Sequence, residues 1–154
     1  MFTFPNPVNE VAARLVAGMT LGLAAVTIAT GSPWLLAILL YEFVARVLTG
    51  PTLSPMGTLA TKVLAPRIAK PRPVPGPPKR FAQGVGLATS ATAVLLFLVT
   101  GSMLLPAAVL GVLSVFAALE AFVGFCAGCF VFGYLMRWGL IPESVCKKCV
   151  VPGV

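Results

Sequence analysis

The feature that most constrains this chain is a pair of long uncharged runs, residues 15–41 and 81–119. At about 1.5 Å per residue, the second run would form a helix of about 58 Å, nearly twice the hydrocarbon thickness of a bilayer, about 30 Å. That run therefore has to turn back on itself. Turn signals divide both runs, at Gly31-Ser32-Pro33 and at Gly101-Ser102.

These runs predict an all-α integral membrane protein with four transmembrane helices. Composition agrees, because 10% of the residues are charged and 58% are apolar, whereas soluble domains carry about a quarter charged residues. The helices should form two hairpins within a single membrane domain spanning residues 1–154. The expected helices are 11–30, 33–49, 81–100 and 105–125. The expected segments are a first hairpin at 11–50, a basic Pro-rich connector at 51–80, a second hairpin with a Cys-x-x-Cys end at 81–140, and a Cys-x-x-Cys tail at 141–154.

The distribution of cations predicts the orientation. Basic residues gather in the connector, and the two turns carry none. The positive-inside rule then places the connector and both termini in the cytoplasm of a bacterial inner (plasma) membrane. The net charge of +7 is mostly this topology signal, and the connector lacks the aromatic residues expected of a nucleic-acid site. The cations are Lys62, Arg67, Lys70, Arg72, Lys79 and Arg80, with Lys147 and Lys148 in the tail.

Two local structures are expected in the connector. Residues 71–78 are so rich in proline that they should form an extended, polyproline-like strap without regular hydrogen bonds, which could alternatively dock a partner protein. Before the strap, helical spacing of apolar and basic residues predicts a short interfacial helix with its apolar side toward lipid. Its residues are Leu59, Lys62, Val63, Leu64, Arg67 and Ile68.

Three charges lie inside the expected spans, where charge is normally paired or functional. Glu42 and Arg46 are four residues apart on one helix, and Glu120 on another reaches a matching depth. They are expected to form a buried Glu42-Arg46-Glu120 network that locks the hairpins together. A proton or ion path using the same residues is the alternative.

The absence of histidine excludes His-based nucleophilic catalysis and His-ligated zinc, and four glutamates make a paired-carboxylate hydrolase improbable. What remains is four cysteines, as Cys126-Ala-Gly-Cys129 and Cys146-Lys-Lys-Cys149. Both pairs are expected at the cytoplasmic, reducing side, which disfavours stable structural disulfides. Their spacing is in the range of four-thiolate zinc sites, so Cys126, Cys129, Cys146 and Cys149 could bind zinc or another soft metal.

The competing interpretation is redox or sulfur transfer by the same cysteines. A Cys-x-x-Cys at a helix N-terminus has its thiolate stabilised by the helix dipole. Gly124 and Gly128 would allow the last span to end and a new helix to begin near Cys129. The two dithiols could then exchange a disulfide, a sulfane sulfur or a soft metal. A third alternative is that the cysteines are inert, small apolar residues.

Three segments carry a resemblance: Asn6-Pro-Val-Asn-Glu10, Pro78-Lys-Arg-Phe-Ala-Gln-Gly84 and Gly124-Phe-Cys-Ala-Gly-Cys129. Together they resemble an uncharacterised, actinobacterial-type integral membrane family known as a domain of unknown function. The resemblance implies thiol or sulfur metabolism with a thioredoxin-like or thiosulfate sulfurtransferase partner, and it applies first to Cys126 and Cys129. It also shares Asn9, Glu10 and Arg14, which physically could cap the first helix and pair near the interface.

The sequence therefore predicts a membrane thiol protein, most simply a thiol-disulfide or sulfur relay. A soft-metal protein and a non-catalytic accessory subunit that anchors a partner remain the alternatives. Besides lipid and the implied soluble partner, a second copy of the chain could help to bury the intramembrane charges. No nucleic acid is expected.

Overall fold

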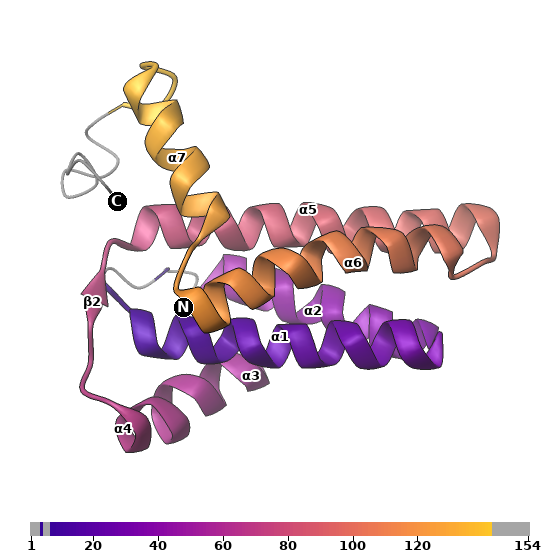
Figure 1. The fold of residues 1–154 in the computed structure, drawn as a ribbon, viewed down its shortest axis with the longest axis horizontal. Coiled ribbons are helices and arrows are strands. Elements are labelled where there is room, and N and C mark those ends of the chain that lie inside the picture. Colours follow the sequence, from indigo (N-terminus) through magenta and orange to yellow (C-terminus); the bar gives the residue numbers. More distant parts are fainter. Residues whose placement is uncertain (1–3, 5–6, 143–154) are drawn as a thin grey trace.

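The computed structural model describes residue 4 and residues 7–142, and within them the chain is an all-α bundle (Figure 1). Four long helical segments form it: α1 (Glu10–Thr30), α2 (Pro33–Thr49), α5 (Gly76–Thr100) and α6 (Leu104–Ala118), which continues into the π-helical turn η2 (Leu119–Val123). α5 packs on α2 and α6, and α1 packs on α6 and α2. The expected tail at 141–154 lies almost wholly outside the described residues.

The ends of α1 and α2 follow from local chemistry. The Asn9 side chain caps α1 by accepting a hydrogen bond from the Val11 amide, at 3.1 Å. Gly31 ends α1 in the left-handed conformation (φ 64°), which favours glycine, and its amide donates to the Thr27 carbonyl. Pro33 then begins α2, where its missing N–H costs nothing. The expected bounds of these two helices are confirmed to within one residue.

Length and composition identify a membrane protein. Among the described residues, three helices are long and apolar enough to cross a bilayer: Glu10–Thr30, Gly76–Thr100 and Leu104–Val123. α2 is shorter, with 17 residues, and carries two charges. A cluster of Leu36, Leu39, Phe43 and Leu110 forms the bundle core, while large apolar side chains such as Val99 face outward.

The connector contains more helix than expected. A helical segment runs through α3 (Pro55–Thr58), the π-helical η1 (Leu59–Leu64) and α4 (Ala65–Ile68), so it begins before the expected interfacial helix. Ala60 and Ala65 pack on α1, whereas Leu59, Val63 and Ile68 are exposed. These three exposed apolar residues belong to the expected lipid-facing set.

The Pro-rich strap differs from the prediction. β2 (Pro73–Val74) pairs antiparallel with β1 (Val8–Asn9), and the Asn9 side chain also accepts a hydrogen bond from the Arg72 amide at 3.2 Å. The extended part is therefore hydrogen-bonded to the N-terminal segment. Moreover, α5 begins at Gly76, five residues before the expected start, because Pro77 and Pro78 occupy the first turn, where proline is tolerated.

A separate helix, α7 (Ala127–Arg137), follows η2 at the Cys-x-x-Cys end of the second hairpin, where a new helix was expected to begin near Cys129. It lies against the first part of α5 and projects away from the bundle (Figure 1). The Phe81 and Phe132 rings pack with centroids 5.7 Å apart. A Cβ added at Gly128 would lie 2.5 Å from Cβ of Ala82, so glycine is needed for this close approach.

Candidate functional site

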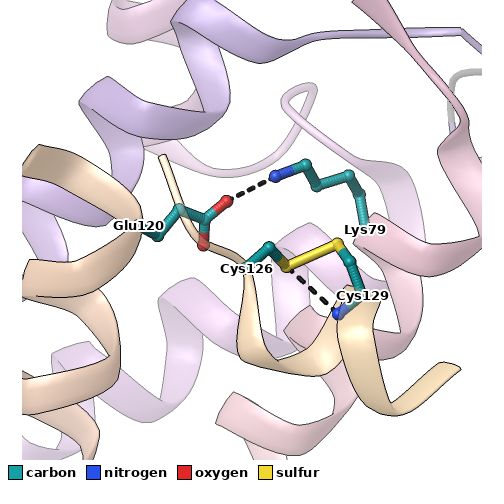
Figure 2. Close-up of a disulfide and its surroundings, with 4 residues drawn as sticks. All are labelled: Lys79, Glu120, Cys126 and Cys129. Atoms are coloured by element: carbon teal, nitrogen blue, oxygen red, sulfur yellow. Dashed lines mark hydrogen bonds and ion pairs between the residues drawn. A yellow bond between two sulfur atoms is a disulfide. The ribbon is translucent and has the colours of Figure 1, made fainter. Parts of the chain in front are cut away.

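The candidate site is built around a disulfide between Cys126 and Cys129 at the N-terminus of α7 (Figure 2). Cys126 is the N-cap residue, and its Sγ accepts a hydrogen bond from the Cys129 amide at 3.2 Å. The two Cα atoms are 5.2 Å apart, in the normal range for a disulfide. Both cysteines are partly exposed. The expected new helix is confirmed, with its start at Ala127 rather than near Cys129.

The backbone turn before the disulfide is held in place by α1. Gly124 ends η2 with φ 79°, a left-handed conformation that favours glycine, and leaves residues 125–126 outside any helix. The Arg14 guanidinium donates to the Ala121 carbonyl, at 3.1 and 3.3 Å, and to the Phe122 carbonyl at 3.1 Å. Arg14 therefore satisfies carbonyls at the end of η2, which have no further helical partner.

An ion pair lies beside the disulfide. The Lys79 ammonium, from the first turn of α5, is 2.6 Å from Glu120 Oε1 on η2, and Figure 2 shows the two side chains meeting next to the cysteines. These side chains are 11% and 17% exposed. The pair joins α5 to the segment from which α7 starts. Among the described residues, this is the one ion pair between side chains.

The expected Glu42-Arg46-Glu120 network is corrected by these contacts. Arg46 forms no salt bridge with either carboxylate, although all three residues are described. Glu42 instead accepts hydrogen bonds from the Ser54 hydroxyl and from the Met56 amide, at the start of α3. Glu120 binds Lys79. The physical reason is that other donors bind both carboxylates in place of Arg46. The prediction compared only the depths of the three residues along their helices, so it did not include these donors.

Arg46 is nevertheless a buried cation, 4% exposed. Its Nε donates to the Glu42 backbone carbonyl and its Nη1 to the Thr20 hydroxyl, each at 3.1 Å. The guanidinium also lies over the Phe43 ring, 4.4 Å from the centroid. Lys79 and Ser54, by contrast, were missed from the sequence. The Pro77-Pro78 pair was the signal that could have placed Lys79 in a helix.

The arrangement can support thiol chemistry. When the disulfide is reduced, the N-terminal amides of α7 stabilise a thiolate at Cys126 through hydrogen bonding and the helix dipole. Disulfides form and break by thiolate attack, so a Cys-x-x-Cys pair of this kind can take part in exchange reactions. Among the residues that the structure describes, no group of three or more His, Cys, Asp or Glu side chains is placed to hold a metal. Cys146 and Cys149 lie outside the described residues, so the four-thiolate site stays a prediction.

Comparison with known proteins identifies a family for this chain. The model of a family described as a domain of unknown function (DUF4395) matches residues 8–137, which include α1 to α7 and both cysteines of the disulfide. No curated protein sequence matches the chain, and neither does any solved structure.

Proposed function

The chain belongs to this family, and we propose that it is a membrane thiol protein whose Cys126–Cys129 pair relays disulfides or sulfur to and from a soluble partner. The observation that carries the proposal is the disulfide at the N-terminus of an 11-residue helix. The partner is a thioredoxin-like or sulfurtransferase protein, as the family resemblance implies. Cys146–Cys149, on the tail, is the accessible pair that exchanges with the first.

The exchange step balances in atoms and electrons. A partner thiolate attacks one sulfur of the Cys126–Cys129 disulfide, so that a mixed disulfide forms and the other sulfur leaves as a thiolate. A second partner thiol then attacks the mixed disulfide, which oxidises the partner and reduces the membrane pair to a dithiol. α7 contributes by stabilising the leaving thiolate, and the Arg14 contacts keep the turn in place.

The same proposal includes the membrane topology. α2 is the fourth span, the two helical hairpins are inserted in the inner membrane, and both termini face the cytoplasm. Support comes from the basic connector residues Lys62, Arg67, Lys70 and Arg72. In Figure 1, α4 and α7 both lie toward the end of the bundle opposite the two turns, so the disulfide would face the cytoplasm with the connector.

A redox titration tests the relay. Purified Cys146→Ser/Cys149→Ser protein in detergent is incubated with reduced thioredoxin and then alkylated, and intact mass counts the modified thiols. We expect two modified cysteines per chain, and none in the matched variant in which all four cysteines are replaced by serine. If the first pair stays oxidised at every thioredoxin ratio but is reduced by excess dithiothreitol, the relay proposal is wrong.

A soft-metal site with four thiolates is the second candidate. It is favoured by the separation of 5.2 Å between the Cα atoms of Cys126 and Cys129, which suits two ligands on one helix turn, and by the spacing to Cys146 and Cys149. One zinc held tightly per reduced chain, and lost in Cys146→Ser/Cys149→Ser, would favour it over the relay. An accessory subunit would instead keep its function when all four cysteines are replaced.

A further inference from the structure

A cavity of about 370 Å³ lies next to the disulfide, and its wall includes residues that are exposed on the outside of the bundle, such as Val112 and Phe116. Helices α1, α2, α5 and α6 contribute to its wall, and Cys126 and Gly128 close one part of it. Along α6 and η2 the wall runs from Val112 to Glu120, about 12 Å of helix. Its volume falls in the range of roughly 300–1,000 Å³ that is typical of sites for small organic ligands.

Arg46 and Gln83, which line this cavity and also a second cavity of about 250 Å³, each carry a buried polar atom with no hydrogen-bond partner. Arg46 Nη2 and Gln83 Oε1 are both buried and make no hydrogen bond. Arg46 is 4% exposed as a whole, so the free nitrogen is a hydrogen-bond donor held away from water. An unsatisfied buried donor of this kind is unfavourable and points to a missing acceptor.

The rest of the cavity sets the character of the ligand. Aromatic rings of Phe43, Phe81 and Phe116 line it, together with small and aliphatic side chains. The formal charges near the cavity sum to zero. Lys79 is paired with Glu120, and the positive Arg46 lies one helical turn from the negative Glu42. A neutral, flat, largely apolar molecule with a hydrogen-bonding oxygen therefore fits better than an anion.

We propose that this cavity binds a lipid-soluble quinone, which takes electrons from the reduced Cys126–Cys129 pair. Arg46 Nη2 donates to a quinone carbonyl, and Gln83 Oε1 accepts from the hydroxyl of the quinol product. Cys126 lines this cavity, whereas Cys129 is not among its lining residues, so we assign the reaction with the ring to the Cys126 sulfur. The inference rests on the proposed function, because it needs a Cys126–Cys129 pair that cycles.

The step is a two-electron transfer. The Cys126 thiolate adds to the quinone ring, which takes up a proton. The Cys129 thiolate then attacks the Cys126 sulfur, the S–S bond forms, and the C–S bond breaks with its electron pair going to the ring. A second proton completes the quinol. In total, two thiols and one quinone give one disulfide and one quinol.

The test uses the full chain in detergent, in the Cys146→Ser/Cys149→Ser background, with the first pair reduced chemically and the reductant removed. Ubiquinone-1, whose ring is fully substituted, is the probe, and quinol formation is followed by absorbance. We expect one quinol per chain, and intact mass should show loss of two hydrogen atoms from the protein. The Cys126→Ser/Cys129→Ser variant should form none.

Matched variants separate the cavity from random collision. Val112 lines the cavity and is 56% exposed, whereas Val115 on the same helix is 59% exposed and outside the lining. Val112→Trp should lower the rate at least about tenfold because the indole fills the site, while Val115→Trp keeps it. Gln83→Leu should lower it about fivefold through one lost hydrogen bond.

The outcomes distinguish this inference from the proposed function. If reduced thioredoxin reduces the pair but ubiquinone-1 does not reoxidise it, the relay stands and the quinone site is wrong. The quinone site is also wrong if Val112→Trp and Val115→Trp react at equal rates, since the reaction then occurs outside the cavity. If thioredoxin cannot reduce the pair but the chemically reduced protein passes electrons to the quinone, the relay fails and the quinone site stands.

Discussion

At one end of the bundle, near the turns that follow α1 and α5, the side chains are apolar and exposed: Leu98 is 71%, Val99 83% and Leu104 78% exposed. At the opposite end, Lys79 forms an ion pair with Glu120, Arg14 donates to the Ala121 carbonyl, and the disulfide follows directly after this segment. The exposed apolar side chains of the first end are suited to contact with lipid, whereas the second end is stabilised by hydrogen bonds and an ion pair within the chain. Substitutions should therefore act very differently at the two ends.

Lys79→Ala, at the disulfide end, should cause the largest loss of stability. It leaves Glu120 largely buried without its ion-pair partner, and removing one member of a buried pair costs about 3–5 kcal/mol. Thermal unfolding in detergent measures the loss. The matched control is Lys62→Ala, which removes the same charge from an exposed position on η1.

A double replacement sharpens this prediction. Lys79→Met/Glu120→Met removes both charges, so it should recover much of the stability that Lys79→Ala loses. If Lys79→Ala unfolds at the same temperature as Lys62→Ala, the ion pair does not hold this end of the bundle together.

The two ends also differ in how well their structure could be predicted from the sequence. The turn end follows from Gly31 and Pro33, whose backbone chemistry acts locally. The new helix at the disulfide end was foreseen for the same reason, from Gly124 and Gly128. The partners of Glu42 and Glu120 were not, because hydrogen bonds to Ser54 and Lys79 depend on where the connector folds back in space. For this reason the described residues do not show the direct ion pairs of Arg46 with Glu42 and Glu120 that were expected from helix depths alone.

Arg14→Gln should have an intermediate effect at the disulfide end. It removes the guanidinium that binds the Ala121 and Phe122 carbonyls, and hydrogen bonds to a charged group contribute about 1.5–3 kcal/mol. The turn before Cys126 loses its support from α1, so alkylation of the reduced cysteines should become faster. The unfolding temperature should also fall. Unchanged alkylation together with a lower unfolding temperature would mean that Arg14 supports η2 but not the disulfide.

Val99→Ala at the turn end should have the smallest effect, within about 0.5 kcal/mol, because an exposed side chain has few contacts to lose. Thermal unfolding in detergent again measures it, beside Lys79→Ala in the same preparation. A loss comparable to that of Lys79→Ala would contradict the comparison between the ends. Since Val99 is 83% exposed within one chain, such a loss would require a contact from outside it, and a dependence of the unfolding temperature on protein concentration would identify that contact as a second copy.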